Sequence, residues 1–139
     1  MIILDTNVIS EVGKSQPDPR VRQWLGSQVI ADLYATSTSL AEISFGIEKL
    51  PAGRRQDTLR NGMQIFFDRY FAGRILPFDE AAARAYGVLV AAARSRGRSI
   101  LIADGQIAAI AHVHGLSVAT RDTAPFEAAG VSVVNPWML

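Results

Sequence analysis

Short apolar runs alternate along the chain with segments whose apolar residues follow a helical period. The apolar runs predict five strands, at residues 2–4, 33–36, 75–78, 116–119 and 131–134. The periodic segments predict five helices, at residues 39–50, 58–71, 79–97, 103–115 and 123–130. Strands that alternate with helices in this way form a parallel sheet. The pattern therefore predicts an α/β fold with helices on both faces of the sheet.

Local signals mark the ends of several predicted helices. Asp79 is a candidate N-cap, and Gly97 and Gly115 are candidate terminating glycines. The segment 14–20 contains two prolines and is predicted to be a surface loop. No repeat, low-complexity stretch or linker divides the chain, so residues 1–139 are expected to form a single domain.

The composition excludes several classes of chemistry. The chain has no cysteine, which excludes thiol catalysis, disulfide bonds and thiolate zinc sites. A formal net charge of +1 gives no general signal for nucleic-acid binding. No signal peptide is recognisable, and no apolar stretch approaches the roughly 20 residues of a membrane-spanning helix. We therefore expect a soluble, cytoplasmic protein without a membrane partner.

Four acidic residues stand near the ends of predicted strands or the beginnings of predicted helices. They are Asp5, Glu42, Asp104 and Asp122. Ligands of doubly wound sheets bind beyond the carboxyl ends of the strands, so these carboxylates could converge there. Other acids are predicted to be solvated surface residues, namely Glu11, Asp18, Asp57, Asp68 and Glu127.

Each of the four acids also has a purely structural explanation. Ser39 and Glu42 form an S-x-x-E pattern, in which Glu42 would accept a backbone amide as part of a capping box. Asp104 could be an N-cap, and Asp122 could form an ion pair with the adjacent arginine. Asp5 could accept the amides of its own turn.

If the four acids converge, the repulsion between their charges is larger than the stabilisation that a helix cap provides. A helix cap contributes about 1 kcal/mol. Two like charges 4 Å apart repel by about 4 kcal/mol at an effective dielectric constant of 20. Converging carboxylates must therefore take up protons or bind a cation. Because no histidine or cysteine joins them, their oxygens suit Mg²⁺ or Mn²⁺ better than zinc.

Other conspicuous residues are predicted to be structural. His112 and His114 are two residues apart near a helix end, which makes them a poor chelate and predicts surface positions. The arginines of segment 94–98 could contact phosphates, although a solvated helix end is the favoured interpretation. The aromatic stripe at residues 66–71 is predicted to be core or dimer surface.

Several stretches of the sequence resemble a known family. They are "IILDTNVIS", "TSLAEISFGIEKLPAGRR" and "ILIADGQIAAIAHVHGLSVATRDTAPFEAAGVSVVNPW". These stretches and the spacing between them resemble the PIN-domain ribonuclease toxins of the VapC/FitB type, from bacterial toxin–antitoxin pairs. The resemblance runs over essentially the whole chain. The resemblance implies a single PIN-like domain whose five-stranded parallel sheet has the order 3-2-1-4-5.

The resemblance also implies which residues form the site. The residues that match the family's four catalytic and metal-binding acids are Asp5, Glu42, Asp104 and Asp122. The residues that match its supporting polar shell are Thr6, Asn7 and Thr120. The implied cofactor is Mg²⁺ or Mn²⁺.

The implied activity is that of an endoribonuclease held inactive by a cognate antitoxin. The expected partners are the RNA substrate, the antitoxin and a second copy of the chain, with DNA bound only indirectly through the antitoxin. Metal-assisted hydrolysis would leave a 5′-phosphate and a 3′-hydroxyl. A 2′,3′-cyclic phosphate would contradict this mechanism, because it requires attack by the 2′-hydroxyl of the RNA.

Three other classes of protein are alternatives to this nuclease. A response-regulator receiver needs a lysine after a late strand, whereas Lys14 and Lys49 both lie early. A haloacid-dehalogenase-like phosphatase needs an aspartate two residues after its nucleophile, where this chain has Asn7. A non-catalytic module, whose acidic pocket captures a basic residue of a protein partner, stays open as an alternative.

Overall fold

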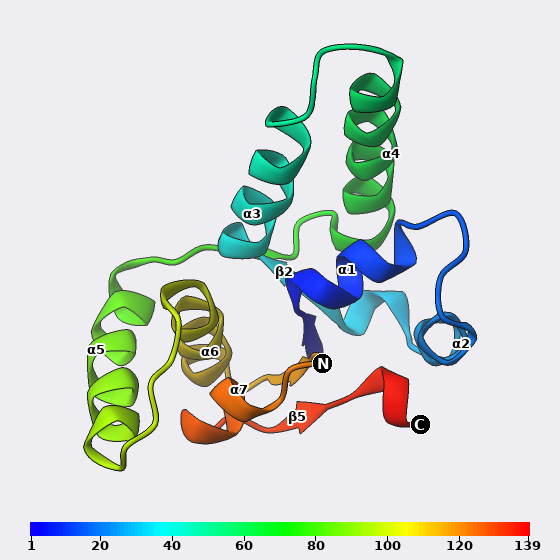
Figure 1. Ribbon diagram of the computed structural model, residues 1–139. Coiled ribbons are helices and arrows are strands. Elements are labelled where there is room, and N and C mark those ends of the chain that lie inside the picture. Colours follow the sequence, from blue (N-terminus) through cyan, green and yellow to red (C-terminus); the bar gives the residue numbers. More distant parts are fainter.

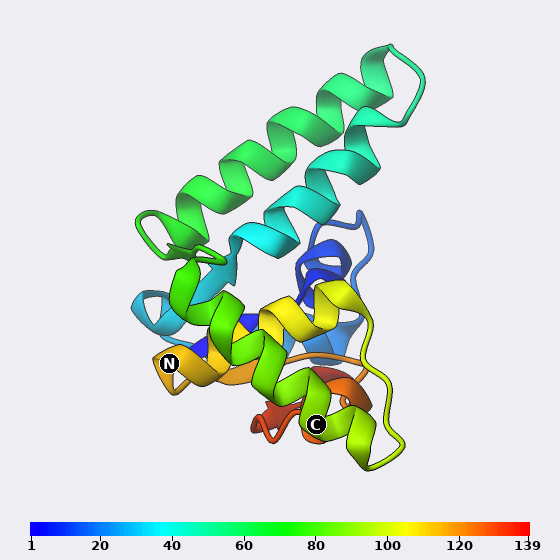
Figure 2. The ribbon, with the colours of Figure 1, turned by 90° about the vertical axis from the view of Figure 1, so that its left-hand side faces the viewer.

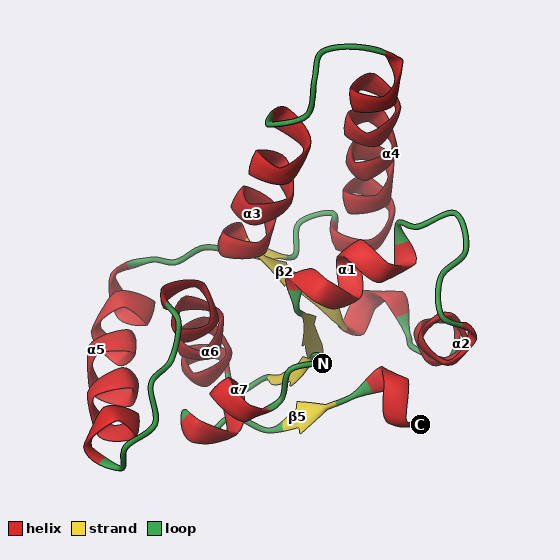
Figure 3. Cartoon of the chain, viewed as in Figure 1, coloured by secondary structure: helices red, strands yellow, loops and turns green.

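One five-stranded sheet forms the centre of the protein, which the computed structural model describes from Met1 to Leu139. The strand order is β3-β2-β1-β4-β5 and all neighbouring strands are parallel, as predicted. The strands are β1 (Ile2–Leu4), β2 (Leu33–Thr36), β3 (Ile75–Leu76), β4 (Ser117–Ala119) and β5 (Val133–Val134) (Figure 3). All five predicted strands are confirmed, although the last three are shorter than predicted.

Seven α-helices surround the sheet (Figure 1). They are α1 (Thr6–Val12), α2 (Pro19–Gly26), α3 (Ser37–Glu48), α4 (Arg54–Phe71), α5 (Glu80–Ser95), α6 (Ile102–His114) and α7 (Ala124–Ala128). Two short 3₁₀ turns are also present, η1 (Ile30–Asp32) and η2 (Pro136–Met138). The five predicted helices are confirmed as α3 to α7.

The sequence pattern predicts neither α1 nor α2. The segment 14–20 is a loop only as far as Asp18, whose carboxylate accepts the Arg20 amide at 2.8 Å and thereby caps α2. Pro19 then occupies the first helical position, which suits its fixed φ and missing N–H. Both helices have eight residues or fewer, too few for a helical period to be distinct in the sequence.

Helices cover both faces of the sheet because successive residues of a strand point to opposite sides. Ile2 and Leu4 pack into an apolar cluster with residues of α1, α2, α3 and α4. Ile3 packs into a second cluster with residues of α5, α6 and α7. Figure 1 shows these two groups of helices on either side of the sheet. The strand β1 therefore contributes to both halves of the core.

The helices α3 and α4 extend beyond the sheet as an antiparallel pair, which we call the α3–α4 arm (Figure 2). The aromatic stripe at residues 66–71 lies at the foot of this arm. Phe67 and Phe71 are buried in the first apolar cluster, and Phe66 and Tyr70 pack against it. The core interpretation of the stripe is therefore confirmed. None of the helices combines the length and the apolar character that crossing a membrane requires.

Glu11 is not the solvated residue that the sequence predicts. It is 8% exposed, and its carboxylate accepts hydrogen bonds from the Asp18 amide and the Lys14 ammonium group. The hydrogen bond from Lys14 lowers the pKa of the Glu11 carboxyl below its usual value. The end of α1 is thereby tied to the cap of α2. Asp18 is half-buried, whereas the other acids predicted at the surface are exposed, namely Asp57, Asp68 and Glu127.

The histidines and the arginine-rich helix end lie where the sequence predicts. His112 and His114 are exposed in the last turn of α6. The arginines of segment 94–98 are exposed at the end of α5, and Arg96 donates a hydrogen bond to the Ala128 carbonyl at 2.7 Å. These residues lie apart from the carboxyl edge of the sheet and take no part in the site described next.

Candidate active site

Asp5 lies directly after β1, the central strand, at the carboxyl edge of the sheet. It is 4% exposed. One carboxylate oxygen accepts the Thr6 amide at 2.7 Å and caps α1. The other accepts the Thr120 hydroxyl at 2.8 Å and the Asn7 side-chain amide at 3.2 Å. The carboxylate thus does accept an amide of its own turn, but it also faces groups that come from the other end of the chain.

Thr120 and Asn7 join the end of β1 to the segment after β4. The single hydroxyl proton of Thr120 is donated to Asp5, so its oxygen accepts the Asn7 side-chain amide at 3.2 Å and the Asp122 backbone amide at 3.1 Å. The side-chain carbonyl of Asn7 accepts the Arg121 amide at 3.2 Å. These bonds fix the position of Asp5 relative to the backbone that carries Asp122.

Glu42 comes to the same edge from α3, which follows β2. The N-cap of this helix is Thr36, whose hydroxyl accepts the Ser39 amide at 3.1 Å, so the capping-box explanation of Glu42 is wrong. Glu42 is exposed and instead accepts the Thr6 hydroxyl at 2.7 Å. Thr6 also lies 2.9 Å from the Ser39 hydroxyl, from which it can accept a hydrogen bond while donating to Glu42.

Asp104 and Asp122 approach from the other side of β1. Asp104 is half-buried in the first turn of α6, but the cap of that helix is Leu101, so the capping explanation of Asp104 is wrong. Asp122 is exposed after β4 and forms no ion pair with Arg121. The Arg121 guanidinium instead lies over the ring of Trp137, 5.3 Å from its centroid. The structural explanations of both acids therefore fail.

The charges of these acids act on one another. Burial, with a smaller contribution from the negative charges of Asp104 and Glu42, outweighs the hydrogen bonds from Thr120 and Thr6 and raises the pKa of Asp5 to about 6. Burial also raises the pKa of Asp104, and the charges of Asp122 and Glu42 add to this effect. The four carboxylates therefore share one electrostatic environment, although they are up to 117 positions apart in the chain.

The donor set fits a hard divalent cation in its chemistry. All four groups are carboxylates, the ligands that Mg²⁺ and Mn²⁺ prefer. Burial and repulsion from neighbouring carboxylates disfavour the charged forms of Asp5 and Asp104 in the absence of a cation. Their side chains do not form a closed ligand set, because no three acidic or histidine side chains are arranged to hold one ion. Glu42, for example, is turned toward Thr6. A bound cation would therefore have to draw the carboxylates together.

Three further residues support the site through contacts that the sequence did not predict. Ser39 contacts Thr6 beside Glu42. The Thr38 hydroxyl donates to the side-chain carbonyl of Gln106 at 2.9 Å, which links α3 to α6 one turn from Glu42 and two residues from Asp104. The S-x-x-E pattern includes Ser39, but it predicts a capping box and not a contact with Thr6. No sequence signal marks the Thr38–Gln106 contact.

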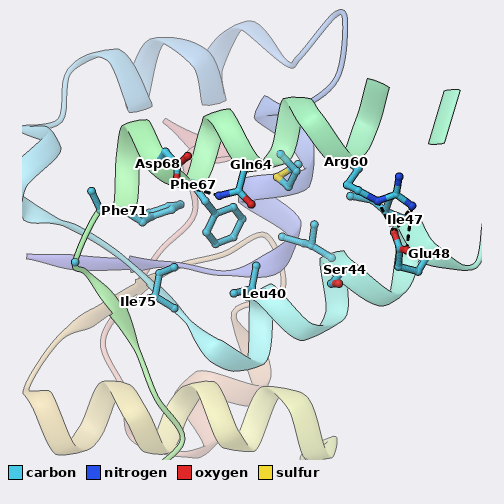
Figure 4. Close-up of a pocket in the computed structure, with 14 residues that line it drawn as sticks. Leu40, Ser44, Ile47, Glu48, Arg60, Gln64, Phe67, Asp68, Phe71 and Ile75 are labelled. Atoms are coloured by element: carbon cyan, nitrogen blue, oxygen red, sulfur yellow. Dashed lines mark hydrogen bonds and ion pairs between the residues drawn. The ribbon is translucent and has the colours of Figure 1, made fainter. Parts of the chain in front are cut away.

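An apolar groove lies in the α3–α4 arm, away from the acids (Figure 4). This groove has a volume of about 290 Å³. Its apolar lining includes Leu40, Phe67 and Phe71, and at its outer end Arg60 bridges Glu48 and Asp57. None of the four acids of the site lines this groove.

The strand order and the acidic carboxyl edge together define a PIN-like α/β protein. The model of the PIN-domain family matches residues 2–131. The chain therefore belongs to the PIN-domain family, which confirms the predicted family and fold.

Relatives of known name give a narrower likeness. A VapC ribonuclease from Sinorhizobium fredii is 49% identical over 137 residues, which cover 99% of this chain and 98% of that protein. Toxin FitB from Neisseria gonorrhoeae is 46% identical over 137 residues, covering 99% of each chain. The solved structure of FitAB bound to a DNA fragment matches with a TM-score of 0.94 at 46% identity, covering 100% of this chain and 97% of that one.

Proposed function

We propose that the protein is a Mg²⁺- or Mn²⁺-dependent endoribonuclease and the toxin of a toxin–antitoxin pair. The observation that carries this proposal is the electrostatic coupling of four carboxylates at the carboxyl edge of a PIN-domain sheet. Repulsion among them favours the binding of a cation at this edge. The proposal is further supported by full-length relatives that are named a VapC ribonuclease and a FitB toxin.

The four acids are proposed to divide the work of the site. Asp5 and Asp104 would hold the cation directly, because Asp5 is buried and Asp104 half-buried, and burial together with neighbouring negative charges raises the pKa of each. Glu42 and Asp122 are exposed and would contribute directly or through bound water. The bound ion would activate a water molecule and offset the charge that grows on the phosphate.

The surrounding residues position these acids and handle the proton. Thr120 and Asn7 hold one oxygen of Asp5, so its carboxylate keeps a fixed orientation. Thr6 holds one oxygen of Glu42, and the second oxygen can accept the proton of the attacking water. Attack by water, without a covalent intermediate, would leave a 5′-phosphate and a 3′-hydroxyl on the cleaved RNA.

A protein partner forms the second half of the proposal. The relative FitB is named a toxin, and a solved structure contains FitAB on a DNA fragment. By analogy, this chain would bind an antitoxin that suppresses its activity, would reach DNA only through that antitoxin, and would form a homodimer. Coexpression with the neighbouring reading frame, followed by size-exclusion chromatography with light scattering, tests the complex and its stoichiometry.

RNA cleavage by the purified protein tests the catalytic half. Single-stranded RNA should be cut in the presence of Mg²⁺ or Mn²⁺, and the products should carry 5′-phosphates. Chelation with EDTA and the substitution Asp5→Asn should each abolish cleavage. Cutting that persists in either sample would contradict the metal mechanism. A protein that cuts no RNA under any of these conditions would instead favour the non-catalytic binding module.

A further inference from the structure

A polar cleft opens directly beside the acidic site, between α1, α3 and the beginning of α4. Its volume is about 830 Å³, larger than the apolar groove of the α3–α4 arm. At one end it is lined by Thr6 and Glu42, which belong to the site. At the other end it is lined by Lys14 and Arg55. In Figures 1 and 2, α1 lies at the foot of the arm, where the two meet.

The charge of the cleft changes from acidic at the site to basic at its far end. Arg55 is exposed in the first turn of α4 and takes part in no ion pair, so its guanidinium is free to bind an anion. Lys14 binds Glu11, yet its side chain is 60% exposed and an ammonium group has three donors. The cleft therefore offers cationic donors within reach of the acidic cluster.

The walls of the cleft leave room for a chain. Gly46 lies one helical turn beyond Glu42, on the same face of α3, and no atom lies within 4 Å of where a β-carbon would stand. The wall here is bare backbone. Apolar residues at the base, Ile47 and Met63 among them, could contact sugars and base faces, and Ser10 adds a hydroxyl.

We propose that this cleft holds the single-stranded RNA that flanks the scissile phosphate, with Arg55 and Lys14 binding its backbone phosphates. The inference rests on the proposed nuclease function, which places a phosphate at the acids. The strand beside that phosphate must leave along the surface, and this cleft is a concave path that begins at Glu42. An acidic peptide could also bind Arg55, but it would gain nothing from a path that leads into a cluster of carboxylates.

Paired arginine variants test the proposal because the chain supplies a close control. Arg54 and Arg55 are adjacent in the first turn of α4 and both exposed, but Arg54 lines neither the cleft nor the groove of the arm. Fluorescein-labelled single-stranded RNA is titrated in EDTA, so that metal-dependent cutting is prevented, across a range of salt concentrations. Arg55→Gln should weaken binding and reduce the salt slope by about 0.7, the value of one phosphate contact on a single strand. Arg54→Gln should leave the slope unchanged.

Filling the cleft gives a second test that does not depend on charge. Gly46→Phe would place an aromatic ring in the cleft, whereas Gly46→Ala adds only a methyl group. With Mg²⁺ present, Gly46→Phe should raise KM for RNA several-fold, and the smaller Gly46→Ala should raise it less. Both variants should unfold at or above the wild-type temperature, because glycine costs about 1 kcal/mol in a helix interior.

The outcomes separate this inference from the nuclease proposal. Equal salt slopes for Arg55→Gln and Arg54→Gln would overturn the proposal that the cleft binds RNA, even if RNA is cut. The absence of RNA binding by the wild type in EDTA would overturn it as well. RNA binding that depends on Arg55, without any metal-dependent cutting, would support the proposal that the cleft binds RNA and contradict the proposed nuclease activity. A polyglutamate peptide that binds through Arg55, when RNA does not, would assign the cleft to an acidic protein partner and overturn the proposal.

Discussion

Asp5 illustrates how the site combines burial with charge. Its carboxylate is nearly excluded from solvent, yet it receives hydrogen bonds from a backbone amide, a hydroxyl and a side-chain amide. These donors favour the ionised form, whereas burial and the charges of Asp104 and Glu42 favour the protonated form. Burial dominates, so the pKa of Asp5 rises to about 6. A residue under such opposing influences is suited to binding a cation.

The raised pKa of Asp5 makes the stability of the metal-free protein depend on pH. The pKa is about 6 in the folded protein against a reference value of 3.8, so the folded state binds more protons between these values. The free energy of unfolding should therefore fall by about 2 kcal/mol as pH rises from 4 to 8. Asp5→Asn should remove this loss and be more stable than the wild type at pH 8, as measured by urea unfolding in EDTA.

The control for this prediction is Asp68→Asn, which changes an exposed acid of α4. This variant should keep the wild-type dependence of stability on pH. If Asp5→Asn showed the same fall in stability between pH 4 and pH 8 as the wild type, Asp5 would not be the group responsible.

Thr120 supports Asp5 through a hydroxyl that no apolar residue can replace. It is fully buried, donates to Asp5 and accepts the Asp122 amide. Thr120→Val would keep the shape but leave buried polar groups unpaired, at a cost of about 2 kcal/mol in the free energy of unfolding. Thr120→Ser should recover most of this loss. Chemical denaturation of both variants provides the measurement, and equal stabilities would argue against the role of the hydroxyl.

At this scale the sequence predicted the acids but not their contacts. Asp5, Glu42, Asp104 and Asp122 stand out because strand ends and helix beginnings are visible in the pattern of apolar residues. The partnership of Thr6 with Glu42 joins residues 36 positions apart, and periodicity contains no information about such pairs. For the same reason the sequence could not exclude the capping explanations, which only the observed caps Thr36 and Leu101 remove.

The helices α5 and α6 approach each other closely at Gly105. This glycine follows Asp104 in the first turns of α6, and a β-carbon added here would lie 2.6 Å from the ring of Tyr86 and 3.1 Å from Val90. The absence of a side chain therefore allows α6 to approach α5. This approach sets the position of the helix that presents Asp104 to the site.

Gly105→Ala should destabilise the protein by about 1 to 3 kcal/mol, because the rigid Tyr86 ring would have to move. The matched control is Gly87→Ala in α5, where no atom lies within 4 Å of the added carbon. That substitution should stabilise the helix by up to about 1 kcal/mol. Thermal unfolding compares the two. A stabilising Gly105→Ala would show that the two helices do not depend on this contact.

The elements were predicted to the extent that each has a clear period or cap. The helix α6 ends at Gly115, whose φ of 65° lies in the left-handed region, as the sequence predicts for a terminating glycine. The helix α4 begins at Arg54, four residues before the predicted start at residue 58, because its first turn is polar and carries no apolar period. The helix α1 was missed because its seven residues begin inside the D-T-N sequence of the site.

The whole molecule has two core clusters that lie on opposite faces of the sheet. Ile2 and Leu4 of β1 belong to one cluster and Ile3 belongs to the other. If β1 left the sheet, both clusters would therefore lose buried residues. We therefore propose that residues 1–139 behave as a single domain. The shared strand also explains why acids from both layers lie near its carboxyl end, close enough for their charges to act on one another.

A single domain should unfold in one cooperative transition. Tryptophan fluorescence reports on the first cluster, because Trp137 belongs to it and Trp24 packs against it. Far-ultraviolet circular dichroism reports on the helices of both layers. The two signals should change at the same urea concentration in EDTA. Transitions at different concentrations would show that the two layers are separable units.

Binding of Mn²⁺ is the most direct test of the central claim that Asp5, Glu42, Asp104 and Asp122 form one cation site. Isothermal titration at about pH 7.5 should show saturable binding to the wild type. Asp5→Asn and Asp104→Asn should each abolish it, whereas the exposed control Asp68→Asn should bind like the wild type. Wild-type affinity in Asp5→Asn, or no binding by the wild type at millimolar Mn²⁺, would contradict the account.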